Sequence, residues 1–193
     1  LYPSMQIVGN QKTFGLMNQF YNMDLEGRTV VVKEGDVLDL GEHKLTFVMA
    51  PMVHWPEAMM TYESTHKILF SADAFGSFGA LDGAVFNDEN LDPHGLHSEM
   101  RRYYSNIVGK YGMQVQAVLK KAAGLEISMI CPLHGPIWRE DLGWLLDKYQ
   151  KWSSYTPEEN TVAIFYGSMY GNTAEAADLL AGMLTAAGVK GVT

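Results

Sequence analysis

The stretch Thr161–Thr173, TVAIFYGSMYGNT, joins an apolar, strand-like run to a loop rich in glycine and hydroxyl groups. An apolar run with helical spacing, Ala174–Ala187, follows directly. This order of strand, glycine loop and helix is typical of the phosphate-binding turn of doubly wound α/β folds. Backbone N–H groups at the helix N-terminus attract an anion, Gly171 lets the backbone approach it, and Ser168 and Thr173 add hydroxyl donors. We therefore expect a phosphate monoester to bind here.

The rest of the chain reads as a different domain. Residues 161–193 predict only the opening βα unit of a doubly wound domain, with no neighbouring strand for pairing. The polar segment 151–160 predicts a linker. Residues 1–150 alternate short apolar strands with helices, which indicates a layered α/β domain. The strands expected there are Gln6–Val8, Thr29–Lys33, Val37–Leu40, Lys44–Ala50, Met59–Tyr62, Lys67–Ser71 and Ile127–Cys131, and the helices are Lys12–Tyr21, Glu99–Tyr111, Met113–Ala123 and Asp141–Tyr149.

Composition narrows the function classes. The formal net charge of -8 argues against nucleic acid or an anionic membrane as the main partner. No apolar run approaches the ~20 residues of a membrane span. The single cysteine, Cys131, excludes an internal disulfide and fits a reducing compartment, which we take to be the cytoplasm.

Three potential metal ligands, His54, Asp73 and His134, each follow an apolar strand. A rigid strand end can hold a ligand while its loop stays open to substrate. Two imidazoles with a carboxylate suit Zn, Fe or Mn, and the two oxygens of Asp73 could bridge a pair of ions. The plain alternative is hydrogen-bonded loop histidines beside a turn aspartate. The remaining histidines are expected to be solvated in polar turns: His43, His66, His94 and His97.

Three ligands are few for a catalytic metal, and a pair of ions needs more. The chain contains no H-x-H or H-x-E-x-D-H pattern. We therefore expect further ligands to precede Leu1 and the chain to be part of a longer protein.

The segments Pro51–Glu57, Leu69–Gly76 and Cys131–Pro136 closely resemble the flavodiiron proteins, and the loop at 166–173 follows them in the order of that family. The resemblance covers nearly the whole chain. It implies a partial metallo-β-lactamase-like αββα sandwich over 1–150, followed by the first βα unit of a flavodoxin-like domain.

The same resemblance implies two non-haem iron ions and one FMN. His54 and His134 would each ligate one iron, and Asp73 would bridge them. The FMN phosphate would lie in the loop. The residues implied for it are Ser168, Met169, Tyr170, Gly171, Asn172 and Thr173.

The implied activity is reduction of O2 to water or of NO to N2O. Electrons would come from a rubredoxin-like protein or a flavin reductase through the FMN, within a head-to-tail homodimer or a tetramer. Trp55, Phe75 and Trp138 are candidates for shaping an apolar pocket for the gas, with ordinary core packing as the alternative for aromatic residues beside strands.

Two other functions stay open. One is a zinc hydrolase of the metallo-β-lactamase fold, acting through a metal-bound hydroxide. The other is a non-catalytic FMN-type electron-transfer module in which the phosphate loop is the functional site.

Overall fold

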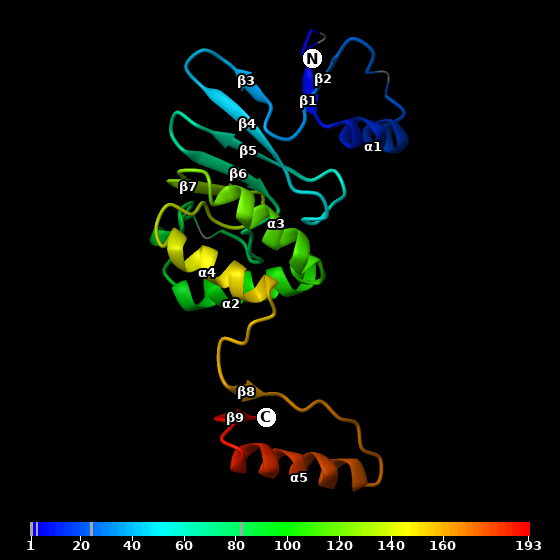
Figure 1. Ribbon diagram of the computed structural model, residues 1–193, viewed down its shortest axis with the longest axis vertical. Helices are drawn as coiled ribbons and strands as arrows, with labels where there is room; N and C mark the ends of the chain where they lie inside the picture. Colours follow the sequence, from blue (N-terminus) through cyan, green and yellow to red (C-terminus); the bar gives the residue numbers. More distant parts are fainter. Residues whose placement is uncertain (1, 3, 24, 82) are drawn as a thin grey trace. The chain divides into compact units, whose positions relative to one another are not determined.

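The computed structural model describes residues 2, 4–23, 25–81 and 83–193. It divides into two units, Leu1–Tyr155 and Thr156–Thr193, and the second is drawn in orange to red in Figure 1. Within the described residues, no helix is both long enough and apolar enough to cross a membrane.

A five-stranded sheet with the order β3-β4-β5-β6-β7 organises the first unit. Strands β3 to β6 pair antiparallel, whereas β6 and β7 run parallel. Met60, Tyr62 and Leu69 are buried at alternate positions of β5 and β6, because successive side chains of a strand point to opposite faces. The strands are β3 (Val37–Asp39), β4 (Lys44–Met49), β5 (Met59–Glu63), β6 (Ile68–Ala72) and β7 (Met129–Pro132).

Helices pack against the buried side chains of this sheet and share one hydrophobic core with it (Figure 1). Met100, Val108, Ile130 and Leu145 are fully buried there, and each contributes about 1.5–3 kcal/mol relative to an exposed position. The five-stranded sheet and these helices thus supply one sheet and one helical layer of the expected αββα sandwich. The helical segments are α2 (Pro93–Tyr103), a π-turn (Tyr104–Val108), a 3-10 turn (Gly109–Tyr111), α3 (Gly112–Ala122) and α4 (Leu142–Ser153).

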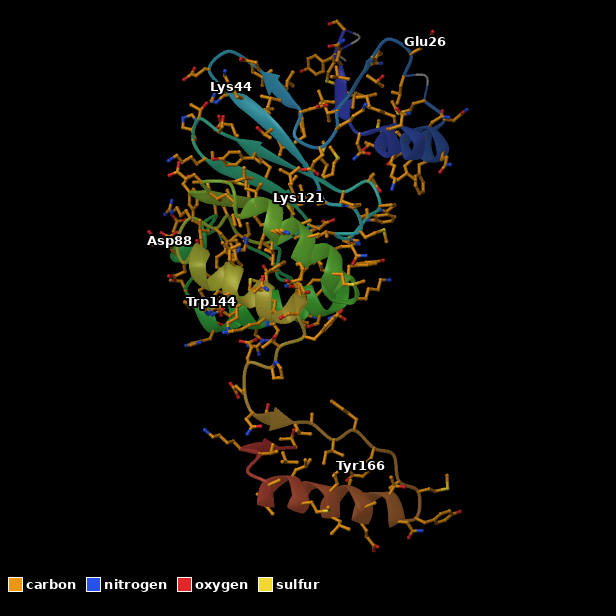
Figure 2. All side chains as sticks on the ribbon, viewed as in Figure 1. Glu26, Lys44, Asp88, Lys121, Trp144 and Tyr166 are labelled. Atoms are coloured by element: carbon orange, nitrogen blue, oxygen red, sulfur yellow. The ribbon has the colours of Figure 1, made fainter. Side chains whose placement is uncertain are left out.

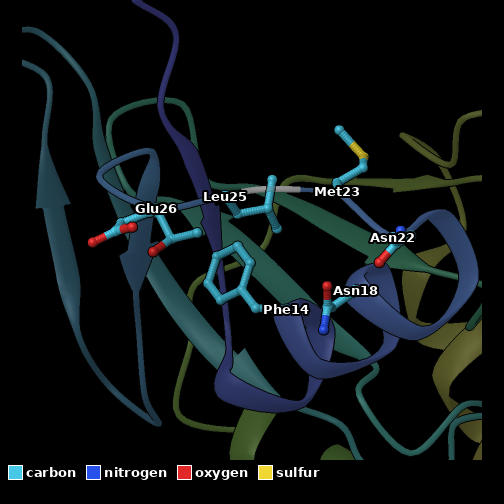
Figure 3. A pocket seen from close by; sticks show the side chains of 7 residues that line it. Phe14, Asn18, Asn22, Met23, Leu25 and Glu26 are labelled. Carbon is cyan, nitrogen blue, oxygen red and sulfur yellow. The ribbon is translucent and has the colours of Figure 1, made fainter.

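The N-terminal segment forms a small βαβ unit of β1 (Ile7–Gly9), α1 (Gln11–Tyr21) and β2 (Thr29–Val31), with parallel strands. The Asn10 side chain caps α1 by accepting the N–H groups of Lys12 and Thr13, and its amide donates to the Glu57 carbonyl at 2.7 Å. A hollow of about 540 Å³ lies beside α1, with Phe14 among its lining side chains (Figure 3).

The second unit contains β8 (Thr161–Val162), α5 (Asn172–Ala186) and β9 (Gly191–Val192). β8 and β9 pair in parallel, with α5 as their crossover. The expectation that the first strand has no partner is therefore wrong, because the last residues of the chain turn back beside it. The regular strand covers only Thr161 and Val162 of the apolar, strand-like run that precedes the loop.

Two helices differ from the sequence-based expectation. α2 begins at Pro93, because Asp92 caps it by accepting the Gly95 N–H and proline suits the first turn. The expected helix Glu99–Tyr111 is not continuous, since a π-turn and a 3-10 turn follow Tyr103. α4 continues to Ser153, beyond the expected end at Tyr149.

Candidate metal centre and phosphate loop

The structure brings the three predicted ligands together. His54 Nε2 lies 3.4 Å from Asp73 Oδ2, and His134 Nε2 lies 3.3 Å from Asp73 Oδ1. The carboxylate therefore stands between two imidazole rings and presents a different oxygen to each. The Asp73 side chain is 15% exposed, whereas that of His134 is 56% exposed.

The sheet topology explains this meeting. β4 and β6 point the same way because β5 runs antiparallel to both, and β7 is parallel to β6. The carboxyl ends of all three strands therefore lie at the same end of the sheet, and the loops that carry the three ligands begin there. The loops are tied to each other: the Leu133 N–H donates to the Ala72 carbonyl at 2.8 Å, and the Ser77 N–H donates to the His134 carbonyl at 3.2 Å.

Left-handed backbone conformations gather in these loops. Met52 has φ 65°, Ala72 has φ 53°, Phe75 has φ 67° and Gly135 has φ 82°. Such angles are unfavourable for residues with a Cβ and persist only where the surroundings enforce them. The surrounding structure therefore enforces the backbone of the loops, and this holds the side chains of His54, Asp73 and His134 in position.

The Asp73 loop rests on the helical layer. The Phe75 N–H donates to the Tyr149 hydroxyl of α4 at 2.5 Å, and the two rings lie 4.3 Å apart. The Ser71 hydroxyl donates to the Ala74 carbonyl at 2.7 Å. Both contacts are buried, so they fix the loop without help from solvent.

Tyr103 adds a protic group to the site. Its ring centroid lies 5.7 Å from that of His134. Burial, and then the charge of Asp73, raise the pKa of the Tyr103 phenol, so that the hydroxyl keeps its proton at neutral pH.

A hollow of about 410 Å³ opens over the two imidazoles. Apolar side chains of Phe78, Ile107 and Leu133 line it together with Tyr103. None of the candidates Trp55, Phe75 and Trp138 lines this hollow: Phe75 and Trp138 are core residues, 2% and 1% exposed, as in the alternative interpretation, and Trp55 is 52% exposed.

The donor set fits metal binding. Two ligands of one ion, each about 2.1 Å from it, lie roughly 3.0–3.4 Å apart, and the two His–Asp separations match that spacing. Each of the two ions would then share Asp73 and take one imidazole. Glu57 Oε2, from the loop that carries His54, is buried and has no hydrogen-bond partner within the described ranges. Such an oxygen calls for a donor or a cation.

The glycine- and hydroxyl-rich loop 166–173 leads into the N-terminus of α5, which begins at Asn172; its binding of a phosphate stays a prediction. The Ser168 hydroxyl accepts the Gly171 N–H at 3.1 Å, and Gly171 has φ 91°. Tyr166, just before the loop, is 53% exposed (Figure 2). The helix dipole and free N–H groups favour an anion, while Glu175 in the first turn opposes one.

The expectation of solvated histidines is wrong for His97, whereas the side chains of His43 and His66 are 45% and 57% exposed and His94 is exposed as well. His97 lies in α2 and stacks on Trp144 with ring centroids 3.8 Å apart. Burial lowers the pKa of His97. His43 and His66 both face Glu63. Sequence spacing gives no signal for the contacts of His97 and His43, because their partners come from another helix and another turn, whereas His66 follows Glu63 by three residues in one turn.

Comparison with known proteins adds a family context. A family model described as ODP family beta lactamase matches residues 1–135. The anaerobic nitric oxide reductase flavorubredoxin of Aeromonas hydrophila is 42% identical over 153 residues, covering 78% of this chain and 30% of that protein.

Solved structures agree. The flavodiiron protein of Giardia intestinalis superposes with a TM-score of 0.83 at 30% identity, covering 96% of this chain and 45% of that one. Rubredoxin oxygen:oxidoreductase of Desulfovibrio gigas gives a TM-score of 0.84 at 31% identity, covering 97% and 47%. The chain thus spans less than half the length of each of these three relatives.

Proposed function

Because the chain belongs to the ODP family of β-lactamase-like proteins, in the region found in flavodiiron proteins, we propose that it forms the diiron part of a reductase of O2 or NO. The observation that carries the proposal is the position of Asp73. Its two oxygens face His54 Nε2 and His134 Nε2 at 3.4 and 3.3 Å, the arrangement that a shared carboxylate between two ions requires.

The residues of the chain have distinct roles in this proposal. His54 and His134 would each hold one iron, and Asp73, which lies between the two imidazoles, would be shared by the pair. Bound ferrous ions would supply electrons and a binding place for a diatomic gas. Tyr103 holds a phenolic proton beside the hollow, where it can donate a hydrogen bond to an oxygen-containing ligand.

The apolar part of the hollow suits an uncharged diatomic better than a charged substrate. Phe78, Ile107 and Leu133 offer no side-chain hydrogen bond to a polar molecule, while the imidazoles and Tyr103 supply the polar part of the lining. This supports gas reduction over hydrolysis of a polar ester or amide.

For the second unit we propose FMN binding, with the phosphate in the loop Ser168–Thr173. The glycine conformation and the helix N-terminus support this role. In the same proposal, residues 1–150 form the diiron domain, 151–160 the linker and 161–193 the start of the flavodoxin-like domain. A rubredoxin-like protein or a flavin reductase would supply electrons, within a head-to-tail homodimer or a tetramer.

The test is iron content after anaerobic reconstitution with Fe(II). The full-length protein, with the further ligands expected before Leu1, should hold two irons. In it, His54→Ala, Asp73→Asn and His134→Ala should each lower iron content and O2 or NO consumption at least about tenfold. His94→Ala is the matched control, since His94 is exposed on α2. Retention of two irons by all three ligand variants, or preferential zinc loading with hydrolytic activity, contradicts the proposal.

A further inference from the structure

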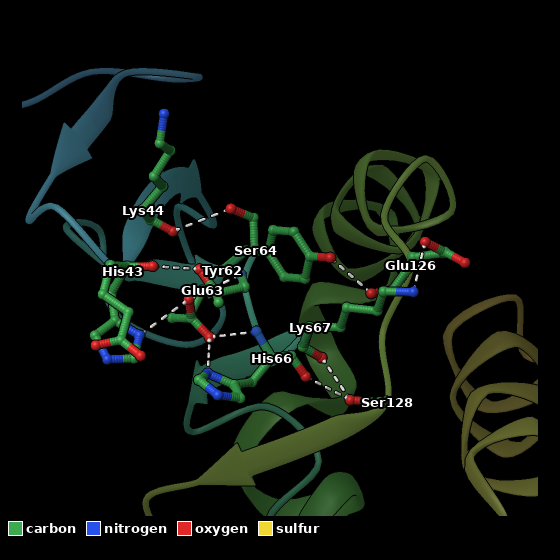
Figure 4. A network of polar contacts seen from close by, with 11 residues as sticks. His43, Lys44, Tyr62, Glu63, Ser64, His66, Lys67, Glu126 and Ser128 are labelled. Atoms are coloured by element: carbon green, nitrogen blue, oxygen red, sulfur yellow. Dashed lines mark hydrogen bonds and ion pairs between the residues drawn. The ribbon is translucent and has the colours of Figure 1, made fainter.

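A second group of imidazole and carboxylate side chains lies at the opposite edge of the sheet (Figure 4). Glu63 ends β5, while His43 and His66 lie in the turns just before β4 and β6. Their ligand atoms all lie within 4.8 Å of one another. β6 begins at this edge and ends beside Asp73, and its five residues span about 17 Å. The group is therefore separate from the site that contains His54.

Glu63 is fixed in place as an ionised carboxylate. Its Oε1 accepts the Thr65 N–H and its Oε2 accepts the His66 N–H, both at 2.8 Å, and the residue is 5% exposed. Burial raises the pKa of Glu63, but these N–H groups outweigh it and bring the pKa down to about 2. Each carboxylate oxygen of Glu63 has a second lone pair, which is available to a partner that lies toward His43 or His66.

The two imidazoles face those lone pairs. His43 Nδ1 lies 3.4 Å from Oε1, and His66 Nδ1 lies 3.2 Å from Oε2 of Glu63. Both separations exceed the usual N–H···O distance of about 2.9 Å. They match the ~3.4 Å between two ligands of one tetrahedral ion. The side chains of His43 and His66 are 45% and 57% exposed, which leaves them free to turn toward an ion and leaves room for water.

We propose that His43, Glu63 and His66 form a second metal site, which binds one Zn²⁺ or a similar divalent transition-metal ion. Two imidazoles and one carboxylate suit Zn²⁺, Co²⁺, Ni²⁺ or Cu²⁺, whereas Mg²⁺ and Ca²⁺ prefer all-oxygen sites. Water completes the coordination at the exposed side. The ion ties the turn before β4 to the turn between β5 and β6, and so stabilises this edge of the sheet.

The test uses Zn²⁺ alone and a background in which the first site is disabled by His54→Ala and His134→Ala. In this background the chain is expected to bind one equivalent of Zn²⁺, measured by calorimetry, and to melt at a higher temperature when Zn²⁺ is present. Adding His43→Ala and His66→Ala lowers Zn²⁺ affinity at least about tenfold and abolishes the melting shift. Adding His94→Ala instead leaves both unchanged.

Circular dichroism without metal checks that every variant is folded. The proposal is overturned if the background variant binds no stoichiometric Zn²⁺, or if its affinity survives loss of both His43 and His66. The experiment is independent of the diiron proposal, because the ligands of the first site are already removed.

Discussion

Replacing Tyr149 by phenylalanine removes one oxygen atom from beneath the Asp73 loop. The Tyr149 hydroxyl accepts the Phe75 N–H at 2.5 Å, and the two residues are 0% and 2% exposed. Phenylalanine keeps the ring that packs 4.3 Å from the Phe75 ring, so the apolar contact stays. What changes is that a buried N–H loses its acceptor in a place that solvent does not reach.

The expected loss follows from this geometry. A buried donor left without its acceptor costs about 1–3 kcal/mol, so Tyr149→Phe is expected to lower the free energy of unfolding by about 2 kcal/mol. With a urea dependence of about 2 kcal/mol per M, the unfolding midpoint falls by about 1 M. Since Phe75 is two positions from Asp73, the affinity for metal is expected to fall as well.

Urea titration followed by tryptophan fluorescence measures this loss, since all four tryptophans lie within the first unit. Tyr155→Phe is the matched control: its hydroxyl donates to the Gly109 carbonyl at 3.1 Å, but the residue is 69% exposed, so a change within about 0.5 kcal/mol is expected. The reasoning is refuted if Tyr149→Phe shifts the midpoint no more than Tyr155→Phe does.

Three further predictions concern Gly135, Glu63 and His97. Gly135→Ala is expected to lower the free energy of unfolding by about 1–3 kcal/mol, because φ is 82° and a Cβ would collide with Ser77 Oγ. Gly143→Ala is expected to raise it by about 0.5–1 kcal/mol, because Gly143 lies in a helix and its Cβ would meet no other atom. Melting temperatures that rank the two variants in the opposite order contradict this prediction. The pKa of Glu63 is about 2 in the folded state, below its ordinary value near 4.5. The ionised carboxylate therefore stabilises the fold fully above about pH 5, and this stabilisation is lost as the pH falls toward 2. In Glu63→Gln the melting temperature should depend less on pH between about 5 and 2, and a pH profile like that of the unsubstituted protein would disprove the prediction. The pKa of His97 is lowered by burial, so stability falls as pH drops below about 6.5, and an NMR titration of its ring with a midpoint at or above that value rules this out.

The local strand patterns predict much of the first unit. Short apolar runs bounded by turns give β4, β5 and β6 within one or two residues of their observed bounds. The same patterns place His54, Asp73 and His134 after strands, and a ligand that follows a strand is located once the strand directions are known.

Other features depend on tertiary contacts that the sequence does not display. The π-turn after Tyr103 interrupts a run with good helical periodicity, and residues 191–192 form a strand only by pairing with β8. His97 is expected in a polar turn, yet it lies in α2 and stacks on Trp144 from another helix. The meeting of His43 and His66 at Glu63 arises from two turns that the sheet brings side by side.

The ligands of the first site come from three loops that lie far apart along the chain, and this determines the order of maturation. An unfolded polypeptide offers no chelating pair here, because His54, Asp73 and His134 approach each other only when β4, β6 and β7 are aligned. In the proposed diiron site the sheet must therefore assemble first, and an ion that binds afterwards would stabilise the folded chain without starting its folding. A cell short of metal would then accumulate the apoprotein in folded form, ready for loading when supply returns.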